Sequence, residues 1–77
     1  MSEDGLAMWT IYDRPFDFPN MYVARKFVIG RGARPQATDH TIVGDDLEPI
    51  RAGFRRAGLT CLPRADADDP KIIEVWL

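Results

Sequence analysis

The spacing of apolar residues predicts a single helix over residues 45–58. Apolar side chains recur there three or four positions apart, which is the period of a helix that buries one face. They are Leu47, Ile50, Phe54 and Ala57. Gly58 follows this run and suits the left-handed position that ends many helices. We therefore expect one helix with one apolar stripe packed against another layer.

The sequence offers two alternatives for the N-cap residue of this helix. Asp45 and Glu48 have the spacing of a capping box, in which two side chains bond each other's backbone N–H groups. With Asp46 as the N-cap, Pro49 falls at the third helical position, where no intrahelical donor is needed. Both arrangements keep Pro49 in the first turn.

Runs rich in β-branched and aromatic residues lie on both sides of the helix and predict strands. They cover residues 8–12, 21–29, 59–62 and 71–77, with a shorter run near 40–43. Residues 30–39 have no periodicity and predict a flexible loop. Side chains alternate between the two faces of a strand. In the last run we expect Ile73, Val75 and Leu77 to face the helix, and Ile72, Glu74 and Trp76 to point away.

The order of these elements predicts an α+β fold, β-β-(β)-α-β-β. Short connections favour antiparallel pairing of neighbours, so we expect a small antiparallel sheet of four to five strands with one helix packed on one face. The polar, acidic start predicts a disordered tail over residues 1–7, and residues 8–77 form a single domain. A chain of 77 residues, 45% of them apolar, is consistent with one globular domain.

One helix cannot cover both faces of such a sheet, so one face is left over. Either Phe16 and Phe18 fold back over that face, or it is an open docking surface. We predict a non-enzymatic protein-interaction module, with a homodimer through the helix-free sheet face or an edge strand as one form. The candidate contact residues are Trp9, Tyr12, Tyr22, Ile72 and Trp76.

Charge and composition exclude some classes of protein. The net charge of −2 argues against a constitutive nucleic-acid binder. No uninterrupted apolar run, Phe27–Ile29 included, approaches the roughly 18 residues of a membrane span. Cys61 is the single cysteine, and the start lacks the basic and apolar regions of a secretory signal. These features predict a cytoplasmic protein with no membrane partner.

Clustered arginines give an alternative hypothesis, an anion or nucleic-acid site on the helix and the 30–36 loop. Its residues are Arg25, Arg31, Arg51, Arg55 and Arg56. Arginine forks suit phosphate and carboxylate groups. Acidic blocks of equal strength separate the basic ones, so mutual neutralisation is the competing interpretation.

No catalytic, cofactor or metal motif stands out in the sequence. His40 and Cys61 are the only candidates for nucleophilic or metal chemistry. One histidine and one cysteine cannot complete a zinc site without several carboxylates, and a Cys–His dyad needs spatial contact. We therefore predict no enzyme, no cofactor and no metal.

Four segments carry a resemblance to other chains. They are Trp9-Thr10-Ile11-Tyr12-Asp13, Pro15-x-Asp17-x-Pro19, Tyr22-Val23-Ala24-Arg25 and Asp69-Pro70-x-Ile72-x-Glu74-Val75-Trp76-Leu77. In these positions the chain resembles a group of short bacterial proteins without an assigned activity, over most of residues 8–77. The resemblance implies a free-standing bacterial protein and no particular catalytic residue.

Overall fold

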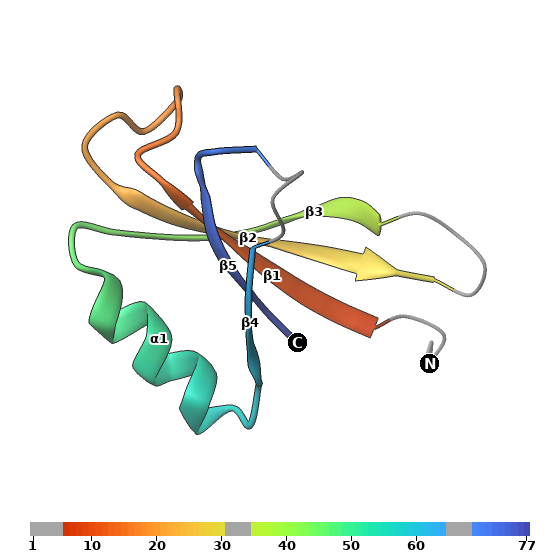
Figure 1. The fold of residues 1–77 in the computed structure, drawn as a ribbon. Coiled ribbons are helices and arrows are strands. Elements are labelled where there is room, and N and C mark those ends of the chain that lie inside the picture. The colour runs from red at the N-terminus through yellow and green to blue at the C-terminus, as the bar shows by residue number, and fades with distance from the viewer. Residues whose placement is uncertain (1–5, 31–34, 65–68) are drawn as a thin grey trace.

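Five strands form in the β-rich parts of the chain and pair into one antiparallel sheet (Figure 1). The structure is a computed structural model and describes residues 6–30, 35–64 and 69–77. The elements are β1 (Leu6–Asp13), β2 (Tyr22–Ile29), β3 (Pro35–Gly44), α1 (Leu47–Arg56), β4 (Cys61–Pro63) and β5 (Ile72–Trp76). The strand order is β3-β2-β1-β5-β4, and α1 lies on one face of the sheet. The predicted α+β fold is confirmed.

The first and third strands are longer than their sequence patterns indicate. β1 begins at Leu6, two residues inside the segment predicted as a tail, and residues 1–5 lie outside the described part. Residues 35–39, predicted as loop, belong to β3, and residues 35–37 pair with the end of β2. Most of β3 is exposed at the sheet edge. An exposed edge strand needs no apolar alternation, which explains why periodicity did not reveal it.

A bulge in β3 lies opposite Lys26, which directly follows Arg25 in β2. The register shifts between Arg25 and Phe27, so that three β3 residues lie opposite Lys26. The Thr38 hydroxyl donates to the Lys26 carbonyl at 2.9 Å and accepts from the His40 N–H at 3.1 Å. The bulge therefore keeps backbone groups satisfied where the ladder is interrupted.

Local chemistry sets both ends of α1. Asp46 is the N-cap, and its side chain accepts from the Glu48 N–H at 3.2 Å. Pro49 is thus at the third helical position, and the Asp46 alternative holds rather than the Asp45–Glu48 box. At the other end Gly58 has φ 83° and donates to Arg55. The following N–H, of Leu59, donates to the Phe54 carbonyl at 3.0 Å, which completes a Schellman ending.

The helix connects the two edges of the sheet, because it follows β3 and precedes β4. The path carries α1 across one face, where Ile50 and Phe54 pack on the sheet. Their neighbours in the core are Ile11, Ala24 and Trp76. The Phe54 ring lies between two indoles, 5.2 Å from Trp9 and 5.6 Å from Trp76 between ring centroids.

The faces of β5 are the reverse of the prediction for Glu74 and Trp76. Both side chains are buried on the helix side, where Trp76 contacts Phe54. A register shift opposite Ile11 and Tyr12 leaves Ile73 unpaired, and Ile73 packs against the same core. The Glu74 carboxylate can be buried on the helix side because an arginine of α1 forms an ion pair with it. Alternation of side chains within one strand cannot predict such a contact.

Candidate functional site

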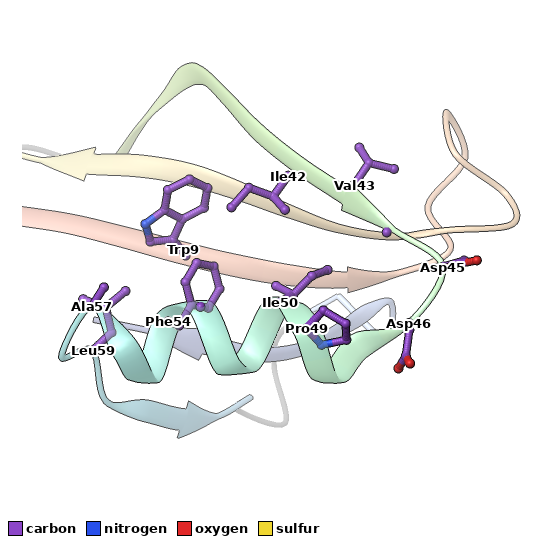
Figure 2. Close-up of a pocket in the computed structure, with 12 residues that line it drawn as sticks. Trp9, Ile42, Val43, Asp45, Asp46, Pro49, Ile50, Phe54, Ala57 and Leu59 are labelled. Carbon is purple, nitrogen blue, oxygen red and sulfur yellow. The ribbon is translucent and has the colours of Figure 1, made fainter.

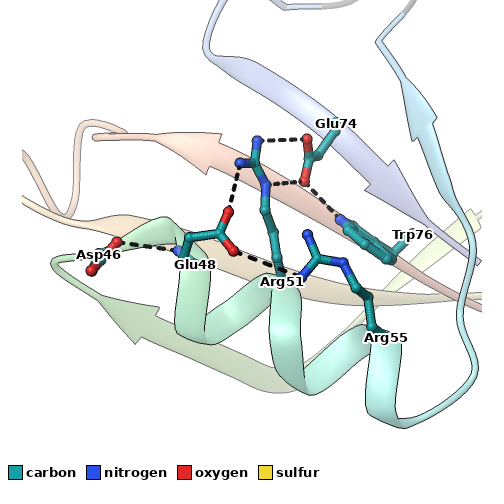
Figure 3. Close-up of polar contacts among 6 residues, drawn as sticks. All are labelled: Asp46, Glu48, Arg51, Arg55, Glu74 and Trp76. Carbon is teal, nitrogen blue, oxygen red and sulfur yellow. Dashed lines mark hydrogen bonds and ion pairs between the residues drawn. The ribbon is translucent and has the colours of Figure 1, made fainter.

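A buried polar cluster ties α1 to β5 (Figure 3). Arg51 Nε and Nη2 each donate to Glu74 at 2.9 Å, one to each carboxylate oxygen. Trp76 Nε1 donates to Glu74 Oε2, also at 2.9 Å. Arg51 Nη1 reaches Glu48 on the solvent side at 3.3 Å. The cluster satisfies every group that it buries, so its geometry indicates a structural clasp rather than a ligand site.

The clasp controls the protonation of Glu74. Burial acts to raise the pKa of Glu74, but the hydrogen bonds from Arg51 and Trp76 outweigh it and hold the pKa below the ordinary value of 4.5. The pKa of Arg51 is raised, chiefly by its bond to Glu74. Both shifts favour the charged pair in the folded state.

This shift predicts an acid-sensitive contribution to stability. A carboxyl group whose folded pKa is depressed stabilises the fold above its unfolded pKa, near 4.5, and that contribution is lost as pH falls through the folded pKa. We expect urea unfolding of the wild type to weaken more between about pH 5 and pH 3 than unfolding of Glu74→Gln, which cannot titrate there. Equal losses in the two proteins would contradict the prediction.

The two candidates for nucleophilic chemistry lie far apart. His40 is on β3 and Cys61 on β4, the opposite edges of the sheet, with three strands between them. Desolvation and then the neighbouring Glu74 raise the pKa of the Cys61 thiol, which disfavours the thiolate. Within residues 6–30, 35–64 and 69–77, no group of three His, Cys, Asp or Glu could hold a metal ion.

An apolar groove of about 510 Å³ opens between α1 and β3 (Figure 2). Trp9, Ile42 and Phe54 supply much of its apolar lining. Its helix wall is made of Pro49, Ile50, Gly53 and Ala57, and Leu59 closes one end. Asp45 and Asp46 stand at the other end, where the chain turns from β3 into α1.

The helix-free face of the sheet is the second apolar surface. Strand register places on it Leu6, Met8, Tyr12, Phe27, Ile29, Leu62 and Val75, which are exposed or half-buried. We call these seven residues the open face. Thr10 and Val23 lie among them and are buried.

The β1–β2 connection covers one end of the open face. Asp17 of this connection forms an ion pair with Arg25 of β2, and the Arg25 guanidinium lies 5.7 Å from the centre of the Tyr12 ring. Pro15 is buried, whereas Phe16 is fully exposed and Phe18 is exposed at the margin. The alternative in which both phenylalanines fold back over this face is therefore wrong for Phe16, whose side chain is fully in solvent.

The predicted interaction residues divide between the two faces. Tyr12 and its partner Ile72 lie on the helix-free side. Trp9, Tyr22 and Trp76 pack around the helix-side core. Trp76 is buried against Phe54, so in this structure it cannot be reached by a partner.

The predicted anion site does not assemble from the described arginines. Arg25 is on the helix-free side and is paired with Asp17. Arg51 is held by Glu74, and Arg55 lies 3.7 Å from Glu48. Arg56 is exposed on α1, and Arg31 lies outside the described residues.

The groove was not predicted from the sequence. Its walls come from three separate segments, and only the fold brings Trp9, Ile42 and Gly53 together. One signal was present: Gly53 sits inside an otherwise regular helical run, where alanine is the better helix former.

Among the residues that the structure describes, no helix has both the length and the apolar character needed to cross a membrane. Comparison of the chain with protein-family models, with curated proteins and with solved structures gives no match.

Proposed function

We propose that this protein is a non-enzymatic interaction module that forms a homodimer through the open face. The observation that carries the proposal is the run of apolar side chains across three adjacent strands, over which no helix or strand of residues 6–30, 35–64 and 69–77 packs. Leu6 and Met8 on β1, Phe27 and Ile29 on β2, and Val75 on β5 remain in contact with water. A continuous apolar patch on a small domain marks an interaction surface or an aggregation liability.

The charges at the margin of the open face favour a second copy as its partner. Twofold symmetry brings the same surface of two molecules together, so a net charge on that surface would face the same net charge on the second copy and disfavour the contact. Arg25 is neutralised by Asp17. Asp69 and Lys71, which carry opposite charges, line the same pocket beside Tyr12. Arg25 lies between Val23 and Phe27 on this side of β2, and its ion pair with Asp17 keeps that part of the surface neutral, which suits an isologous contact.

We further propose a bacterial, cytoplasmic setting for this module, of which the bacterial origin rests on the resemblance alone. Cys61 is a free thiol, as is usual in a reducing compartment. The arginines that the structure describes do not converge into a basic patch, so we do not propose nucleic acid as the partner.

A double variant on the open face tests the dimer. Leu6→Asp/Leu62→Asp places charges on either side of Met8, at positions that are already exposed, so the fold should tolerate them. We expect the wild type to sediment with twice the 8.7 kDa mass of one chain, and the double variant to sediment as a monomer. Burying two carboxylates in each subunit without partners is costly, which is why the dimer should dissociate.

Ile42→Asp is the matched control. Ile42 is 39% exposed and Leu62 is 41% exposed, but Ile42 lies on the helix side of the sheet. The control should remain dimeric. A wild type that stays monomeric at high concentration, or a double variant that still dimerises, would rule out this proposal.

A further inference from the structure

One helix leaves space for a second on the same face of the sheet. Five strands spaced about 4.8 Å apart span roughly 19 Å, whereas a helix with its side chains is about 10 Å wide. The side chains of α1 pack on Ile11, Ala24 and Trp76, from β1, β2 and β5. The groove, with a volume of about 510 Å³, occupies the remaining width of the sheet beside β3.

Gly53 forms part of the helix wall of this groove, and nothing inside the protein explains it. A Cβ at position 53 would meet no atom within 4 Å, so packing does not require glycine there. Glycine inside a helix also weakens it relative to alanine. Ala57 follows one turn later on the same wall. Small residues four positions apart let the backbone of another helix approach closely.

The two ends of the groove differ in charge. Asp45 and Asp46 stand at the end where α1 begins. A helix N-terminus carries only about half a positive charge, so two carboxylates leave this end negative. The rest of the lining is apolar apart from backbone groups. A ligand that matches both ends is apolar along its length and basic at the end near Asp45.

The edge of β3 argues against an added strand as the ligand. β3 begins with Pro35 and carries the bulge opposite Lys26. Proline and bulges both hinder pairing at a sheet edge. A helix needs no such pairing, because its own backbone groups are already bonded.

We propose that the groove between α1 and β3 binds an amphipathic helix of a partner protein, with a Lys or Arg of that helix beside Asp45 and Asp46. Its apolar stripe packs on Trp9, Ile42 and Phe54, and its backbone crosses α1 at Gly53. The groove lies on the helix side of the sheet, so this binding is independent of the proposed dimer through the open face.

A synthetic peptide provides the test. The probe is a helix of about 14 residues, or roughly four turns, with Leu and Ala at helical spacing and Lys at one end. Titration into the ¹⁵N-labelled full chain should shift the amide signals of Ile42, Gly44, Gly53 and Ala57. A matched peptide with Glu in place of Lys should bind at least about tenfold more weakly, equivalent to about 1.4 kcal/mol.

Two substitutions at position 53 separate binding from folding. Gly53→Leu fills the groove and should abolish binding, while Arg56→Leu, on an exposed position of the same helix, should not. Gly53→Ala should raise the urea midpoint of the free protein, since alanine favours helix, yet lower the peptide affinity. Opposite signs for stability and affinity are expected only if a backbone docks at Gly53.

Three results would overturn the proposal: no amide shift with the Lys peptide, undiminished binding to Gly53→Leu, or shifts with decylamine but not with the peptide. The last would identify the groove as a site for small amphiphilic amines. Sedimentation of the same samples reports the dimer separately, so failure of one proposal does not conceal the outcome for the other.

Discussion

Substitution of Phe54 by alanine should lower the free energy of unfolding by about 3–5 kcal/mol, as for other buried Phe→Ala changes. Phe54 is 4% exposed, and its ring lies between Trp9 and Trp76 at centroid distances of 5.2 and 5.6 Å. The Trp76 indole cannot move to fill the space, because its bond to Glu74 fixes it. The variant therefore combines loss of apolar burial with a cavity between two rings.

The size of this loss matters because the domain is small. At about 0.05–0.15 kcal/mol per residue, 77 residues give a total stability of roughly 4–12 kcal/mol. Phe16→Ala makes the same chemical change at a position that is fully exposed. It should stay within about 0.5 kcal/mol of the wild type. Urea unfolding followed by tryptophan fluorescence at one protein concentration measures both, and equal midpoints would refute the assignment of Phe54 to the core.

Local signals predicted α1 well because its ends depend on near neighbours. Asp46 caps Glu48 two residues away, and Gly58 closes the Schellman ending within the same short segment. These contacts join residues that are close in sequence, so residue preferences at helix ends and residue spacing suffice to predict them. The stripe of Ile50 and Phe54 followed from helical period alone.

The faces of β5 depended on a distant residue and were therefore missed. Alternation placed Glu74 away from the helix, as an acid usually is. Arg51, 23 positions earlier, reaches across to Glu74 and makes its burial acceptable. The bulge opposite Ile11 and Tyr12 then sets the position of Ile73. Neither the ion pair nor the bulge leaves a pattern within the strand itself.

The candidate surfaces were predicted in outline only. A sheet with one helix implies an uncovered face, and that much follows from the order of elements. Which residues occupy the open face depends on register, which no single strand specifies. The groove beside α1 depends further on the tilt with which the helix crosses from β3 to β4. In the sequence, Gly53 was the one signal that indicated the groove.

Replacement of the Arg51 guanidinium by an uncharged group should destabilise the fold more than any other single change of charge on α1. Arg51→Met keeps the apolar stem and leaves Glu74 buried without its counter-ion, while Trp76 still donates to it. The Glu74 side chain is 10% exposed and that of Arg51 is 28% exposed. We expect a loss of roughly 2–3 kcal/mol, less than the 3–5 kcal/mol typical of a fully buried pair, because water still reaches the guanidinium.

Two further variants separate the ion pair from the helix itself. Arg55→Met makes the same substitution one turn later, where the pair with Glu48 joins side chains that are 57% and 63% exposed. That pair is screened by water, so Arg55→Met should change the free energy of unfolding by no more than about 0.5 kcal/mol. In the double variant Arg51→Met/Glu74→Gln no charge is buried, and the amide oxygen can still accept from Trp76. We expect urea unfolding at neutral pH to show that the double variant is more stable than Arg51→Met alone. The main cost of Arg51→Met is the uncompensated Glu74 carboxylate rather than the lost hydrogen bonds from Arg51. If adding Glu74→Gln instead lowers stability further, the clasp contributes chiefly through its hydrogen bonds, and our account of the buried charge is wrong.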